Sequence, residues 1–288
     1  VMSVHGQNTI AIVDAKENFV SIKESFSEIF QDINTMLQSK NDDGYVPYTS
    51  NISNRNYLLE FFLGGDMKFL LTVLGMNAAN SKFSCIYCKI DKKDRFDMTK
   101  DEDFYWAGKM MKSISDMKAY SQKKKLNYGS LHPPLLDIDI DHVIIDELHL
   151  MMRIVDVLIR NLIENAVNLD QQENIGSTQK SSRHLTAIVK AIQSCGVSFS
   201  VWENTTKDGK GDSFLKSLEW TSLTGSDMKK LLSDLSTKLL VCEGVPVTAR
   251  EKLSQLWGDF QILYSIMNTW SPSQEMVSQF FNLGKQWV

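Results

Sequence analysis

The chain has 288 residues, of which 43% are apolar and 23% charged, with 15 glycines and 5 prolines. This composition excludes collagen-like, disordered and disulfide-scaffold classes, because the apolar surface is large enough to offset the entropy lost when the chain is ordered. The formal net charge of −4 argues against nucleic-acid binding through a uniformly positive surface. No apolar run approaches the roughly 20 residues that span a bilayer, so we expect no membrane association.

The first 76 residues carry the pattern of an α/β fold. A β-branched apolar run at 9–13 predicts a buried strand, and apolar residues at three- and four-residue steps predict an amphipathic helix over 18–37. A second apolar run at 57–63 predicts another strand, which Gly64 and Gly65 end. Asp66 then starts a helical pattern that runs to residue 74. This order of elements indicates an α/β beginning.

The rest of the chain is predicted to be loop and helix. Residues 77–100 are loop-like and contain a cysteine pair, and helical patterns follow at 103–122, 141–166, 181–194, 225–240, 248–267 and 273–283. We therefore predict three segments: an α/β core over 1–76, a cysteine-bearing segment over 77–128 and a helical segment over 129–288. The predicted fold class is a small α/β start followed by a mainly α-helical region, helix-rich overall.

Asp66 is the most informative single residue. It follows an apolar strand and two glycines and stands at the start of a helix. A carboxylate at that place is positioned to reach a metal ion outside the edge of a sheet, although one carboxylate alone never suffices for Mg²⁺. The alternative is that Asp66 only caps the helix that follows, which is worth about 1 kcal/mol.

The pair Cys85 and Cys88, in a CxxC spacing, is the second signal. Such a turn lets two thiolates face one tetrahedral ion, as structural zinc requires, but it supplies only half of a four-ligand site. The alternatives are a redox pair or two ordinary buried thiols, and the redox interpretation needs the pair at the start of a helix after a βαβ strand. Because the pair lies in a charged loop, we favour zinc, with the missing ligands supplied elsewhere.

Two further sets of residues are candidates for binding. If residues 141–166 form one helix, His142, Asp146 and His149 lie along one face, where they could hold a metal or contact phosphate. An ordinary polar stripe satisfied by neighbouring helices explains them as well. The candidates for DNA contact are Lys92, Lys93, the run Lys123, Lys124 and Lys125, and His149; for the lysines the alternative is that they are solvated loops and helix ends.

Taken jointly, these segments resemble a known family. Residues 61–66 (Phe-Phe-Leu-Gly-Gly-Asp), a helix and then residues 84–88 (Ser-Cys-Ile-Tyr-Cys) are similar to the central part of the catalytic subunit of the V(D)J recombinase and of Transib-type transposases. In that family a CxxC comes nineteen positions after an aspartate, the separation of Asp66 and Cys85 here. Residues 145–149 and the predicted strand and helix from residue 9 onwards extend the resemblance.

The resemblance implies a fold, a reaction and a location. It implies a ribonuclease-H-like core interrupted by a helical, zinc-binding insertion, with Asp66 as the second of three metal-binding carboxylates and Cys85 and Cys88 as half of a zinc site. Such enzymes use Mg²⁺ or Mn²⁺ for in-line attack on a DNA phosphodiester. The implied partners are transposon-end DNA and a second copy of the chain, and the implied location is the nucleus.

The chain starts at Val1 rather than Met, and its last residues have no cap or tail character. We therefore expect an internal fragment of a DDE transposase or recombinase, with the first aspartate and the final glutamate outside it, that cleaves no DNA alone. One alternative keeps the fold but assigns another transposase superfamily. A second is a domesticated, non-catalytic module that binds nucleic acid or protein and depends on zinc, and a third is a purely structural helical protein.

Overall fold

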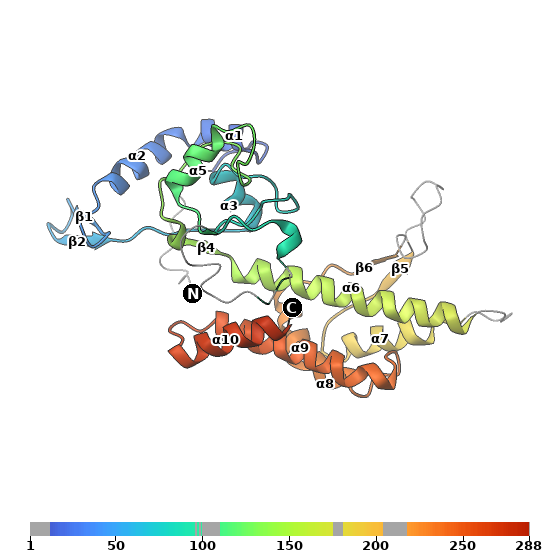
Figure 1. The fold of residues 1–288 in the computed structure, drawn as a ribbon. Helices are drawn as coiled ribbons and strands as arrows, with labels where there is room; N and C mark the ends of the chain where they lie inside the picture. Colours follow the sequence, from blue (N-terminus) through green and yellow to red (C-terminus); the bar gives the residue numbers. More distant parts are fainter. Residues whose placement is uncertain are drawn as a thin grey trace. The chain divides into compact units, whose positions relative to one another are not determined.

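The computed structural model describes residues 12–95, 97, 99, 110–174, 181–203 and 218–287. The chain divides into two compact units, Val1–Asp146 (unit 1) and Glu147–Val288 (unit 2), which are described separately below (Figure 1). The expectation of a helix-rich chain is confirmed, and the described strands form only small, two-stranded sheets. The division into segments 1–76, 77–128 and 129–288 stays a prediction.

Unit 1 combines short helices with two small sheets. Its elements are α1 (Phe19–Ser25), α2 (Ser27–Gln38), β1 (Val46–Thr49), β2 (Asn56–Leu59), β3 (Leu63–Gly65), α3 (Met67–Val73), the 3-10 turn η2 (Lys92–Asp94), α5 (Ile114–Ser121), the 3-10 turn η4 (Ile140–His142) and β4 (Val143–Ile145). The helix predicted over 18–37 is two helices, because the backbone at Phe26 leaves the helical region. Of the strand predicted at 9–13, residues 9–11 lie outside the described residues, and Ile12 and Val13 are exposed and not in a strand.

The strand predicted over 57–63 is also two elements. β2 pairs with β1 as an antiparallel hairpin, whereas β3 pairs in parallel with β4, nearly eighty residues later in the chain. The break follows from this change of partner. Gly64 and Gly65 belong to β3 instead of ending the strand before it.

The core of unit 1 lies between α3 and the loops that follow it. Four side chains are completely buried, namely Leu70, Val73, Leu74 and Met117, and Ile86 and Val143 are nearly so. The apolar side of α3 therefore packs against the cysteine-bearing loop, α5 and β4. This packing fixes the end of β3, where Asp66 stands, relative to Cys85 and Cys88 within one unit.

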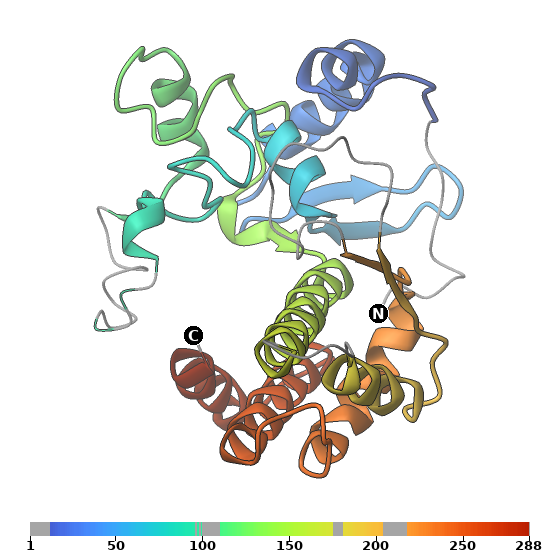
Figure 2. The same ribbon diagram turned by 90° about the vertical axis from the view of Figure 1, so that its right-hand side faces the viewer.

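Unit 2 is a group of helices with one short hairpin. Its elements are α6 (Glu147–Glu173), α7 (Arg183–Gln193), β5 (Val201–Glu203), β6 (Leu218–Trp220), α8 (Gly225–Leu239), α9 (Val247–Met267) and α10 (Gln274–Trp287). Figure 2 views these helices nearly end-on, with α6 beside α7 and with α9 between α8 and α10. The core contains the fully buried Trp257 together with Ile163, Ile192, Leu231 and Leu235.

The helical patterns of unit 2 match the observed helices closely at α7, α8, α9 and α10, but the pattern at 141–166 does not. Val143–Ile145 is the strand β4, and the helix α6 begins only at Glu147 and continues to Glu173. Three successive β-branched residues favour a strand, and the pairing with β3 stabilises it. Of the helix predicted over 103–122, residues 103–109 lie outside the described residues, and α5 accounts for the end of the pattern.

Candidate functional site

Asp66 stands between β3 and α3 and caps the helix. Its Oδ1 accepts a hydrogen bond from the backbone N–H of Phe69 at 2.8 Å, and the side chain is half-buried. A Cβ added at Gly65 would lie only 2.6 Å from the Phe69 ring, so a glycine there lets this first helical turn approach the strand. The side chain of Asp66 therefore caps the N-terminus of α3. The cap occupies one of the two carboxylate oxygens, and no hydrogen bond from the described residues reaches Oδ2.

Asp146 is the neighbour of Asp66 at the same sheet edge. In the parallel pair, Gly65 is opposite Ile145, so each aspartate directly follows its strand. The backbone N–H of Asp146 donates to the carbonyl oxygen of Gly65 at 3.2 Å, which extends the pairing by one residue. Two carboxylate-bearing residues thus come to the carboxyl ends of two adjacent parallel strands, which is where open α/β sheets bind their ligands.

The helical stripe predicted for His142, Asp146 and His149 is wrong, because the three residues do not lie on one helix. His142 belongs to η4, Asp146 follows β4, and His149 is on α6. The His142 ring contacts two carboxylates, Asp141 at 2.9 Å and Glu60 at 3.0 Å, and it stacks on Phe62. The hydrogen bond that the ring donates to Asp141, and after it the one to Glu60, raises the pKa of His142.

Cys85 and Cys88 face each other with their Sγ atoms 3.5 Å apart. Two thiolates on one tetrahedral zinc ion, each about 2.3 Å from it, lie about 3.8 Å apart, whereas a disulfide requires about 2.05 Å. The separation suits a shared ion. The hydrogen bond from Cys88 lowers the pKa of the Cys85 thiol to about 6, and the same contact raises the pKa of Cys88.

A buried lysine donates a hydrogen bond to the backbone of this cysteine pair. Lys112 is only 3% exposed, and its Nζ donates to the carbonyl oxygen of Cys85 at 2.7 Å. Burial lowers the pKa of Lys112 to about 8. The segment is held to the cysteine turn by backbone hydrogen bonds, including Lys112 N–H to Tyr87 at 2.9 Å and Lys89 N–H to Met110 at 2.8 Å. Sequence reasoning missed Lys112, because nothing in its local pattern marks it as buried.

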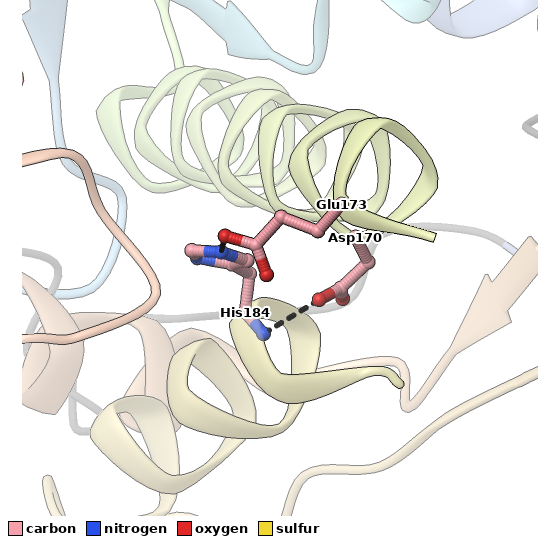
Figure 3. Close-up of side chains that lie close together, drawn as sticks. All are labelled: Asp170, Glu173 and His184. Atoms are coloured by element: carbon pink, nitrogen blue, oxygen red, sulfur yellow. Dashed lines mark hydrogen bonds and ion pairs between the residues drawn. The ribbon is translucent and has the colours of Figure 1, made fainter. Parts of the chain in front are cut away.

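Within the described part of the chain, no third Cys, His, Asp or Glu joins either pair closely enough to share an ion. The one such cluster of three is in unit 2, where Asp170 and Glu173 of α6 lie near His184 of α7 (Figure 3). The sequence analysis did not find it. Glu173 Oε1 contacts the Nε2 of His184 at 2.8 Å, and this hydrogen bond lowers the pKa of Glu173.

The role of Asp170 in this cluster is that of a helix cap. Asp170 is 6% exposed, and its two oxygens accept from the backbone N–H groups of His184 at 2.8 Å and Leu185 at 2.9 Å. Amide dipoles that point at a carboxylate already neutralise much of its charge, so this geometry favours a structural clip between α6 and α7. Asn174 strengthens the clip through hydrogen bonds with the backbone of Ser181 at 2.7 and 2.8 Å.

The lysines predicted to contact DNA are exposed and lie in unit 1. Lys92 and Lys93 form part of η2, and Lys123–Lys125 follow α5. Lys123 lies over the Tyr120 ring, with its Nζ 4.8 Å from the ring centre, and Lys89 contacts the same ring at 5.5 Å. No structural feature assigns a ligand to these lysines, and their role stays a prediction.

No protein-family model, curated protein or solved structure matches the chain. Among the described residues, no helix combines the length and the apolar character needed to cross a membrane.

Proposed function

We propose that this chain is part of a metal-dependent DNA transposase or recombinase of the DDE type, and that Asp66 and Asp146 are ligands of its Mg²⁺ or Mn²⁺. The observation that carries the proposal is that both aspartates directly follow adjacent parallel strands, in register. The resemblance to the V(D)J recombinase and Transib transposases supplies the reaction, which is cleavage and transfer of DNA strands. A ribonuclease-H-like core is the corresponding fold proposal.

The donor set fits a hard divalent cation. Carboxylate oxygens are the ligands that Mg²⁺ prefers, and Mg²⁺ keeps several waters, so two carboxylates are a reasonable part of its shell. Asp66 can serve both as cap and as ligand, because the cap uses only Oδ1. A bound metal would polarise the phosphodiester and activate the attacking oxygen. The chain's own contribution is to hold two negative charges at one sheet edge.

We also propose that Cys85 and Cys88 bind zinc, which supports a second candidate function. In that alternative the chain is a non-catalytic module that binds nucleic acid or protein and depends on zinc. The specific observation in its favour is the 3.5 Å separation of the two sulfur atoms. Transposon-end DNA, a homodimer and a nuclear location accompany the first proposal through the family resemblance alone.

Binding of Mn²⁺ to the purified chain, followed by electron paramagnetic resonance, tests the first proposal without requiring activity. Asp66→Asn is the sharpest variant, because asparagine caps a helix as well as aspartate does and the fold is therefore preserved. We expect Asp66→Asn and Asp146→Asn each to weaken Mn²⁺ binding at least tenfold. Asp32→Asn, at an exposed acid on α2, is the matched control and should change it less than twofold.

The two candidate functions give different results. If Asp66→Asn leaves Mn²⁺ binding unchanged, or weakens it no more than Asp32→Asn does, the strand-end metal site is refuted. If in addition Co²⁺, a spectroscopic substitute for zinc, gives thiolate-to-metal charge-transfer absorption that Cys85→Ser removes, the zinc-dependent module becomes the better assignment.

A further inference from the structure

Unit 2 contains a groove of about 610 Å³ that belongs to neither of the proposed metal sites. One wall is the α7 helix, which contributes Arg183, Thr186 and Lys190, and the other contains Lys238 of α8. Glu243, in the turn that follows α8, also lines the groove. All of these side chains belong to unit 2, so the groove does not depend on how the two units are arranged.

The described residues that line the groove carry an excess of two positive charges. Among the described residues that line it, three are cations and one, Glu243, is an acid, whose carboxylate lies 3.4 Å from the guanidinium of Arg183. Lys190 and Lys238 are exposed and form no ion pair with any residue that the structure describes. A locally positive groove is therefore present in a chain with a net charge of −4.

The polar groups of the groove match a phosphodiester backbone. Ser182, Thr186 and Ser194, which carry hydroxyls, line the groove on the same side as Arg183 and Lys190, and Arg, Lys, Ser and Thr are the side chains that contact phosphate oxygens in DNA complexes. Arg183 and Lys190 are seven residues apart, which is about 10 Å along a helix. The rise along the axis of duplex DNA is about 3.4 Å per nucleotide of one strand, so a row of this length laid along the axis spans about three nucleotides.

We propose that this groove binds the phosphodiester backbone of duplex DNA. The choice of DNA as the phosphate source rests on the proposed function, and the groove deepens it by giving unit 2 a direct contact with the substrate. The contacts are to phosphates, so the groove binds without reading sequence and its affinity falls steeply with salt.

Fluorescence anisotropy with a labelled 20-base-pair duplex, at several salt concentrations, tests the proposal. The triple variant Arg183→Ala/Lys190→Ala/Lys238→Ala should bind at least tenfold more weakly than the unmodified chain. Loss of three phosphate contacts should also reduce the slope of log affinity against log salt by about 2.7. The matched control Arg153→Ala/Lys229→Ala/Lys252→Ala removes the same charge at exposed positions outside the groove and should weaken binding less than threefold.

Each result separates the groove from the strand-end metal site. An equal loss in the control triple variant, or an unchanged salt slope in the groove variant, overturns the proposal. ATP binding as tight as DNA binding and lost in the groove variant would assign the groove to a free nucleotide and also overturn it. Mn²⁺ binding should be unaffected by the groove variant. If DNA binding depends on the groove while Asp66→Asn leaves Mn²⁺ binding unchanged, the groove stands and the metal proposal fails.

Discussion

Replacing Asp170 by alanine should destabilise unit 2 more than any exposed acid does. The carboxylate is 6% exposed and accepts two backbone hydrogen bonds, at 2.8 and 2.9 Å, from the first turn of α7. Asp→Ala removes both acceptors and leaves two amide donors at a helix N-terminus without their partners. The same helix carries Arg183 and Lys190, so the clip also holds one wall of the groove.

The expected size of the effect follows from these contacts. A hydrogen bond to a charged group contributes about 1.5–3 kcal/mol, and loss of a capping side chain costs about 0.5–2 kcal/mol. The two descriptions overlap, because the bonds to α7 are themselves the cap, so we expect a total of about 3 kcal/mol. With a denaturant dependence of about 2 kcal/mol per molar urea, the midpoint of unfolding should fall by about 1.5 M.

Tryptophan fluorescence during urea unfolding is a suitable assay, because the fully buried Trp257 is in unit 2 and Trp106 is the only tryptophan in unit 1. Asp170→Asn, which keeps one oxygen acceptor, should lose about half as much stability as Asp170→Ala. Asp156→Ala is the control, since Asp156 is on the same helix and forms only an exposed ion pair with Arg160 at 3.6 Å. A loss below about 1 kcal/mol for Asp170→Ala, or one no larger than the control, would refute the clip.

Three further predictions concern unit 1. Because the pKa of Cys85 is lowered to about 6, iodoacetamide at pH 7 should modify it faster than the buried Cys195 and Cys242 of unit 2, as followed by peptide mass spectrometry. The rate should fall as the pH drops through about 6. The pKa of His142 is raised in the folded chain, so its contribution to stability is complete below about pH 6.5 and is lost as the pH rises through the folded-state pKa. His142→Gln should flatten the pH dependence of the free energy of unfolding, measured by chemical denaturation. An NMR titration of the folded chain that gives His142 a pKa at or below about 6.5 would contradict this prediction. Gly75 has φ +64°, and an added Cβ would lie 2.3 Å from the His132 carbonyl oxygen. Gly75→Ala should therefore lower the free energy of unfolding, measured by thermal unfolding, by more than about 2 kcal/mol. The control Gly44→Ala, at φ +85° with open space around the added Cβ, should lower it by only about 1 kcal/mol.

The helices of unit 2 could be predicted because their information is local. In α8, for example, Thr224 and Asp227 form a reciprocal capping box, and the apolar residues that follow recur at helical steps. The helix cap at Asp66 was also visible in the sequence, as one of two open interpretations. In each case the residues next to the helix end are sufficient to predict the cap and the start of the helix.

The strand β4 could not be predicted in this way. Periodicity over the three consecutive apolar residues Val143–Ile145 does not distinguish a buried strand from a buried helical turn, and their β-branching favours a strand only weakly. Their conformation is decided by β3, a partner that lies almost eighty residues earlier in the chain. The neighbourhood of Asp66 and Asp146 was missed for the same reason, since it exists only once the two strands pair. The clip at Asp170 could not be predicted either, because it forms only when α6 packs against α7.

Net charge is a sum over the whole chain, whereas phosphate binding depends on which charges share one surface. The excess of four negative charges argues correctly against a uniformly basic surface, but it does not constrain a single groove. Arg183 and Lys190 repeat at two helical turns on α7, and Lys238 approaches from α8, so the fold gathers cations that are up to 55 residues apart in sequence. If the groove variant shows the reduced salt slope of DNA binding and the matched control does not, the placement of these cations, rather than their number, determines DNA binding by unit 2.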